Sequence, residues 1–143
     1  MIPLEQALDR VLAALQPLPS ETVPLADAAG RCLAADLASP LDIPLFDNSA
    51  MDGYAVRSAD LPGTLRLAGR VAAGETFAGA LEAGTCVRLF TGSPLPEGAD
   101  AVVMQEDVTV RGEHIEFPEA ARPLENVRLR GEEIRRGAVT GRQ

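Results

Sequence analysis

The chain of 143 residues has room for one domain or two small ones. Its formal net charge of -8 argues against the positive surface that nucleic-acid binding needs, although an anion can still bind where arginines or backbone amides gather. The 13 glycines and 11 prolines favour many turns and short strands over long helices.

Other features of the composition bear on the cellular compartment. No apolar run reaches the roughly 18 residues that a membrane-spanning helix needs, so no membrane partner is expected. The N-terminus lacks the basic and then apolar pattern of a secretory signal. Two cysteines, Cys32 and Cys86, are too few for a secreted disulfide scaffold, and we expect both to be reduced thiols that act as small hydrophobic residues. These patterns predict a cytoplasmic protein.

The N-terminal segment predicts one amphipathic helix over residues 4–16, because its apolar residues recur with helical spacing. Pro17 and Pro19 are expected to end this helix. After an extended stretch, a single helical turn over residues 26–29 is expected to stop at Gly30.

The rest of the chain has a β-like pattern. Residues 38–50 combine prolines, aspartates and an asparagine, which is typical of a loop, and residues 137–143 match no element, as in a chain that stops before its next unit. A turn at residues 111–113 indicates a hairpin. The expected strands cover residues 31–37, 54–56, 65–71, 85–90, 101–104, 108–110, 114–117 and 127–130. A helix followed by a long β-rich region indicates the α+β class.

The loop at residues 41–54 holds the densest cluster of polar side chains. Five of them fall within eleven positions: Asp42, Asp47, Asn48, Ser49 and Asp52. Such side chains commonly hold tight turns by bonding nearby backbone amides, and the pattern alone favours this structural interpretation. The functional alternative is that one carboxylate faces a cleft and binds Mg²⁺, which typically takes one or two protein carboxylates together with substrate phosphates.

A second cluster occupies residues 91–100. Gly92 can expose backbone amides, and Thr91 and Ser93 add hydroxyl donors, so the turn can cradle an oxyanion. It lacks the Gly-Lys-Ser/Thr ending of a phosphate-binding P-loop. Taken alone, the segment is more typical of an ordinary Pro-Gly turn.

A third cluster occupies residues 126–133. Arg128 and Arg130 are expected on one face of a strand, where a pair of guanidinium groups suits the recognition of an oxyanion. A surface ladder of ion pairs with the neighbouring glutamates is the alternative. His114, the single histidine, lies in the polar hairpin and is expected on the surface, which leaves no histidine-based triad and no Cys/His zinc spacing.

The three clusters, taken together and in order, closely resemble the N-terminal region of the molybdopterin molybdenumtransferases, the family that includes the E domain of gephyrin. The most specific stretch is Phe46-Asp47-Asn48-Ser49-Ala50-Met51-Asp52-Gly53-Tyr54. The resemblance covers essentially the whole chain, and its matching stretches are residues 39–44, 46–56, 91–106 and 126–134.

The resemblance implies an activity and an architecture. The family inserts molybdenum from molybdate into adenylylated molybdopterin, with Mg²⁺, and releases AMP and molybdenum cofactor. Its members are homodimers, and a molybdopterin adenylyltransferase activity acts upstream of them. The first domain is discontinuous and would comprise residues 1–40 and 119–143, and the β-rich second domain, residues 41–118, is inserted in it.

The resemblance also implies roles for individual residues. The family's functional aspartate falls on Asp52, which would also bind Mg²⁺, and its functional threonine falls on Thr91. The functional acidic position falls on Glu133, where the family commonly has aspartate, so the carboxylate extends one methylene further. The expected substrate-binding residues are Asn48, Ser49, Gly92, Ser93, Arg128 and Arg130.

The family's active site is a cleft between the second domain and the third domain of the other protomer, and this third domain, which carries the main pterin pocket, is not in the chain. We therefore expect the chain alone to be inactive. An alternative is a non-catalytic module of the same fold that serves dimerisation or partner docking. A metal-dependent phosphohydrolase is a third hypothesis, and the lack of a second dense Asp/His cluster counts against it.

Overall fold

The computed structural model describes residues 2–16, 18–72 and 74–142. Internal contacts separate the chain into two compact units, one of residues 1–37 with 141–143 and the other of residues 38–140. The boundaries expected from the resemblance, at residues 40/41 and 118/119, differ from this division and stay a prediction.

The first unit contains the helix α1 (Leu4–Ala14) and the single 3-10 turn η1 (Leu25–Asp27). The predicted helix at the N-terminus is confirmed, and it ends two residues earlier than expected because Leu15 already has extended backbone, with φ -83° and ψ 135°. Pro17, one of its expected terminators, lies outside the described residues. No residue of α1 is buried, so its apolar face is exposed.

The turn before Gly30 is also confirmed, one residue earlier than predicted, and Gly30 has the positive φ of +77° that the stop requires. Arg31 forms an ion pair with Glu21 and donates from Nε to the Asp27 carbonyl at 3.0 Å. The predicted strand over residues 31–37 is wrong, because only its last residue, Leu37, belongs to a strand.

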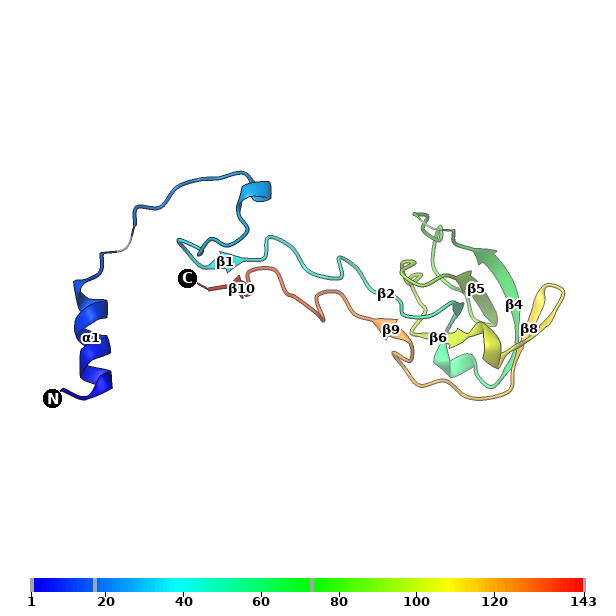
Figure 1. Cartoon of the computed structure of the whole chain (residues 1–143). Helices are drawn as coiled ribbons and strands as arrows, with labels where there is room; N and C mark the ends of the chain where they lie inside the picture. The colour runs from blue at the N-terminus through cyan, green and yellow to red at the C-terminus, as the bar shows by residue number, and fades with distance from the viewer. Residues whose placement is uncertain (1, 17, 73, 143) are drawn as a thin grey trace. The chain divides into compact units, whose positions relative to one another are not determined.

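Two chain segments of the second unit run antiparallel beside each other, one before the main sheet and one after it (Figure 1). β2 (Asn48–Ser49) pairs with β9 (Val127–Arg128), and an isolated bridge joins Ile43 to Ile134. The short β1 (Leu37–Ala38) pairs with β10 (Val139–Gly141). The expectation that residues 137–143 match no element, and that residues 38–50 form only a loop, is therefore wrong.

A six-stranded sheet forms the rest of the second unit, with strand order β6-β3-β5-β4-β8-β7. All neighbouring pairs are antiparallel except β4 and β5, which are parallel. The strands are β3 (Gly53–Val56), β4 (Gly63–Arg70), β5 (Thr85–Leu89), β6 (Ala101–Met104), β7 (Thr109–Arg111) and β8 (His114–Phe117). Five predicted strands and the predicted hairpin are confirmed, and β7 is shifted by one residue.

The sheet buries apolar side chains on both faces, because its strands alternate with period two. Tyr54, Val56 and Cys86 belong to the cluster on one face, and Ala55 and Val87 belong to the cluster on the other. Aliphatic residues build most of this core, as the 3% of aromatic residues in the composition requires. No helix within the described residues is long and apolar enough to cross a membrane.

Candidate functional site

Asp52 lies between β2 and β3, in a turn whose backbone is fixed on both sides. The hydroxyl of Ser49 donates to the Met51 carbonyl at 2.5 Å, and the amide of Gln105 donates to the Asp52 carbonyl at 3.1 Å. Gly53 follows with its Cα close to β6, because a Cβ atom there would lie 2.2 Å from the carbonyl oxygen of Val103. The sequence Asp52-Gly53 therefore combines a partly exposed carboxylate with the one residue type that lets β3 approach β6.

Thr91 lies two residues after the end of β5 and binds the Asp52 carboxylate. Its backbone amide and its hydroxyl both donate to Oδ1 of Asp52, each at 2.8 Å. These two hydrogen bonds, together with the positive charge of Arg88, hold the pKa of Asp52 below its ordinary value of 3.8. The Oδ2 atom has no hydrogen-bond partner among the described residues, so one anionic oxygen stays available to a ligand.

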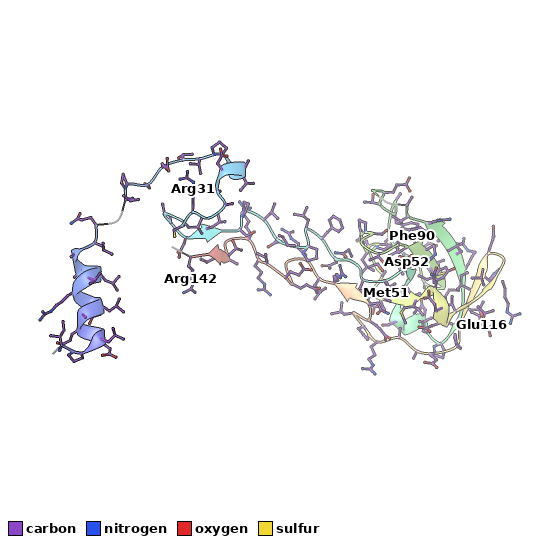
Figure 2. All side chains as sticks on the ribbon, in the orientation of Figure 1. Arg31, Met51, Asp52, Phe90, Glu116 and Arg142 are labelled. Atoms are coloured by element: carbon purple, nitrogen blue, oxygen red, sulfur yellow. The ribbon has the colours of Figure 1, made fainter. Side chains whose placement is uncertain are left out.

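The turn that carries Thr91 is hydrogen-bonded to β2. The amide of Gly92 donates to the Ser49 carbonyl at 2.8 Å, and the amide of Ser49 donates to the Ser93 carbonyl at 3.0 Å. Gly92 has φ +83°, and a Cβ atom there would meet no other atom within 4 Å, so its conformation, rather than crowding, explains the glycine. Residues 48–52 of the first cluster and residues 91–93 of the second therefore form one site. Figure 2 labels Asp52 there, with Phe90 close to it.

Three of the predicted substrate-binding side chains hold this turn from within. Asn48, Ser49 and Ser93 are all buried. The amide group of Asn48 donates to the Phe46 carbonyl at 3.0 Å, and the hydroxyl of Ser93 accepts from the Phe90 amide at 3.3 Å. The polar atoms of these side chains form hydrogen bonds with the protein backbone, and substrate binding by these residues stays a prediction.

The third cluster meets the first at a different place from Asp52. The Asp42 carboxylate accepts hydrogen bonds from Nε of Arg130 at 2.7 Å and from the backbone amide of Arg136 at 2.8 Å. The hydrogen bond from the Arg136 amide, followed by that from the Arg130 side chain, holds the pKa of the Asp42 carboxyl below its ordinary value. Asp47 accepts from the amide of Arg130 at 2.7 Å. These aspartates bind protein groups, as the structural interpretation of the loop predicted.

The predicted strand face that would carry both Arg128 and Arg130 is wrong. β9 ends at Arg128, and Arg130 lies in a turn, where Asp42 and Asp47 bind its side chain and its amide. Arg128 is exposed opposite Asn48, in the same ladder. Glu133 is exposed, and its amide donates to the Ile43 carbonyl at 3.0 Å, so it lies along the ladder rather than in the Asp52 turn.

Three residues that surround the Asp52–Thr91 pair were missed from the sequence: Arg88, Phe90 and Gln105. Arg88 donates from Nη1 to the Gly53 carbonyl at 2.9 Å, and its guanidinium also contacts Gln105 and lies over the ring of Phe90. In the sequence, Arg88 is simply the polar residue of an apolar strand. Its position opposite Tyr54 in the sheet, which would have revealed the contact, depends on the pairing of β3 with β5.

Other candidate groups lie apart from this site. His114 is exposed in β8, as predicted. Both cysteines are free thiols, but only Cys86 is buried as expected, whereas Cys32 is exposed. Within residues 2–16, 18–72 and 74–142, no group of three or more His, Cys, Asp or Glu side chains is placed to hold a metal ion.

Comparison with known proteins shows the family of the chain. The sequence model of the family described as "MoeA N-terminal region (domain I and II)" matches residues 2–143. The chain belongs to this family. The resemblance stated from the sequence is thereby confirmed, together with the α+β, β-rich fold class.

Individual relatives give the same result over part of their length. A molybdopterin molybdenumtransferase of Haemophilus influenzae is 44% identical over 144 residues, which cover 97% of this chain and 35% of the relative. One of Synechococcus elongatus is 39% identical, over 92% and 35%. The crystal structure of a molybdopterin biosynthesis moeA protein from Pyrococcus horikoshii OT3 has a TM-score of 0.93 and 34% identity, and covers 100% of this chain and 40% of that one. The chain therefore spans about a third of the length of the curated relatives it matches.

Proposed function

We propose that this chain is the N-terminal, substrate-facing part of an enzyme that inserts molybdenum from molybdate into adenylylated molybdopterin and releases AMP. The observation that carries the proposal is the Asp52–Thr91 pair, in which one carboxylate oxygen is fixed by two donors and the other is free. An anionic oxygen in a fixed position can bind a cation that bridges to a phosphate, which is the chemistry that this substrate class needs.

The donor set suits Mg²⁺ only as a shared ion. Mg²⁺ prefers oxygen ligands and usually keeps several water molecules, with one or two carboxylates and the substrate phosphates completing its shell. Asp52 can supply one carboxylate oxygen, and among the described residues no group of three or more His, Cys, Asp or Glu side chains could hold a metal ion by itself. We therefore propose that Asp52 binds Mg²⁺ only when the phosphates of the substrate are present, so that the metal supplies charge neutralisation at the phosphoryl group.

The decisive experiment replaces Asp52 by asparagine in the complete product of the gene that encodes this chain. AMP release from adenylylated molybdopterin, with molybdate and Mg²⁺, is measured for Asp52→Asn and for Asp107→Asn. Asp107 is an exposed acid in η3 (Gln105–Asp107) with no hydrogen bond or ion pair of its side chain in the described structure, so it controls for the loss of one negative charge. We expect the Asp52 variant to lose about 100-fold or more in rate and the Asp107 variant to keep it. Equal rates would refute the role of Asp52.

The isolated chain of 143 residues is proposed to be inactive, because it contains one side of the proposed cleft. Purified chain mixed with adenylylated molybdopterin, molybdate and Mg²⁺ should release no AMP above the rate without protein. Steady AMP release by the chain would overturn this part of the proposal. The proposed homodimer, the upstream adenylyltransferase and the cytoplasmic location belong to the same hypothesis.

A non-catalytic docking or dimerisation module is the second candidate, and the helix α1 favours it. Its apolar residues are exposed, Leu4 by 79% and Val11 by 58%. Because apolar side chains at helical spacing usually pack against another surface, this exposed face suits a partner. Sedimentation of the chain separates the two candidates when it is combined with binding of molybdate and of AMP. A stable dimer without affinity for either ligand supports the module, and a measurable affinity supports the enzyme fragment.

A further inference from the structure

We propose that Arg88 is the positioning residue of the Asp52–Thr91 pair. Its guanidinium joins the backbone that follows Asp52 to the strand end that precedes Thr91. This inference rests on the proposed function for its catalytic consequence, whereas its structural part can be tested without any activity.

The first argument is the set of acceptors that Arg88 reaches. Nη1 donates to the Gly53 carbonyl at 2.9 Å and to the Leu89 carbonyl at 3.1 Å, and Nη2 donates to the side-chain oxygen of Gln105. Gly53 is the residue after Asp52, and Leu89 lies two residues before Thr91. One planar group therefore contacts the backbone on both sides of the pair.

The second argument is that these contacts close a ring around the Asp52 peptide. The amide of Gln105 donates to the Asp52 carbonyl at 3.1 Å, and the side chain of the same glutamine accepts from Arg88. Arg88 in turn binds the next carbonyl along the chain, that of Gly53. Two successive carbonyl groups are thus fixed through one network, and they set the direction in which the Asp52 side chain leaves the backbone.

The third argument is that the site requires arginine in particular. The guanidinium lies near two aromatic rings, 5.2 Å from the centroid of Tyr54 and 5.0 Å from that of Phe90, while its edge donates to three acceptors. A lysine ammonium has no flat face and cannot stack and donate in a fixed plane at the same time. Arg88 is half-buried and forms no salt bridge in the described structure, so its contacts are to neutral groups.

Arg70 provides a matched control within the same part of the sheet. It is the register partner of Arg88 in the parallel pair of β4 and β5, and its guanidinium also lies over the ring of Phe90, at 4.8 Å. Among the described residues, it makes no hydrogen bond to the backbone near Asp52 or Thr91. Replacing Arg70 removes the same charge and the same type of ring contact, but it leaves the proposed positioning network intact.

The structural test is amide hydrogen exchange in the full chain of 143 residues. Arg88→Met, Arg88→Lys and Arg70→Met are compared at the amides of Gln105 and Thr91, both of which donate to Asp52, with the amide of Leu67 as a reference for global unfolding. We expect exchange at the two Asp52-linked amides to become at least about tenfold faster in Arg88→Met, less so in Arg88→Lys, and unchanged in Arg70→Met.

Unchanged exchange at both amides in Arg88→Met, with the Leu67 reference also unchanged, would overturn the inference. If Arg88→Met proves too unstable to analyse, Arg88→Lys is measured instead, because it keeps the charge and loses the planar contacts. Unchanged exchange at the Gln105 and Thr91 amides in Arg88→Lys would then overturn the inference. Equal acceleration of all three amides would also count against it, since this would mean a general loss of stability.

The kinetic test uses the complete gene product and separates positioning from substrate binding. A residue that only orients Asp52 and Thr91 should lower kcat by about 10- to 100-fold when replaced and leave KM nearly unchanged. Arg88→Lys should recover part of kcat, and Arg70→Met should keep all of it. A rise in KM at constant kcat would show that Arg88 binds substrate directly and would overturn the inference. If Asp52→Asn keeps full activity, the proposed function fails, and the exchange experiment still decides whether Arg88 orients the pair.

Discussion

The backbone amide and the hydroxyl of Thr91 converge on one and the same oxygen of the Asp52 carboxylate, each at 2.8 Å. Because both donors bind Oδ1, the Oδ2 atom of Asp52 stays free, and the two hydrogen bonds fix the orientation of the carboxylate. A threonine suits the position because its hydroxyl and its amide are close enough to act on a single acceptor. Two residues that lie 39 positions apart in the sequence therefore behave as one structural group.

Replacing Thr91 by valine should raise the pKa of Asp52 toward its ordinary value. Valine keeps the shape of threonine and removes the hydroxyl donor, which is the second-largest cause of the lowered pKa, while the backbone amide still donates. We expect the pKa to remain below 3.8, because the backbone hydrogen bond is the largest cause. The measurement is a titration of the Asp52 carboxyl carbon by NMR in metal-free chain. Thr91→Ser, which keeps the hydroxyl, should leave the pKa near that of the parent, and an unshifted pKa in the valine variant would show that the hydroxyl does not bind Asp52.

Replacing Gly53 by alanine should destabilise the second unit. The new Cβ would lie 2.2 Å from the carbonyl oxygen of Val103 and 2.9 Å from its carbon, so β3 and β6 would have to move apart. Overpacking of this kind costs about 1–3 kcal/mol, and backbone atoms cannot rotate away as a side chain can. Urea unfolding measures the loss. Gly112→Ala is the control, because Gly112 has φ +64° and open space around it and should lose only about 1 kcal/mol through backbone strain.

Much of the sheet was predictable, because strands of apolar residues with turn residues at both ends carry a local signal. The run Ala101–Met104 and the hairpin around Gly112 are examples. The site itself was only half predictable. Asp52 and Thr91 stand out in the sequence by their unusual neighbours. Their contact, however, depends on the pairing of β3 with β5, which no local sequence pattern predicts.

The errors have a common physical cause in long-range hydrogen bonds. Alternation from Val127 onward favoured a longer strand, but Asp42 and Asp47 bind Arg130 and turn the chain away. The residues of β10 have no local strand pattern, and their conformation comes from pairing with β1, which is distant in the sequence. Arg88 was missed for the same reason, since its three acceptors lie on different segments of the chain.

Lowering the pH should remove the stabilisation that Asp42 provides. Its two carboxylate oxygens accept from the Arg136 amide and the Arg130 side chain, so its pKa in the folded state is lowered from 3.8. A group with a lowered folded pKa stabilises the fold above its unfolded pKa and loses this contribution as the pH falls through the folded value. Urea midpoints measured from pH 7 downward should therefore show Asp42→Asn less stable than the parent at neutral pH, with the difference shrinking below about pH 4. A difference that stays constant down to the acid limit would contradict the assigned hydrogen bonds.

The two thiols should differ sharply in reactivity. Cys32 is exposed, whereas Cys86 is fully buried in the sheet, where burial raises the pKa of its thiol to about 12. Because the thiolate is the reactive species, Cys86 is both inaccessible and protonated at neutral pH. Iodoacetamide at mildly alkaline pH should modify one thiol in the native chain and two in urea, as counted by intact mass. Cys32→Ser should react only after unfolding, and rapid modification of this variant in its native state would show that β5 does not hold Cys86 in the core.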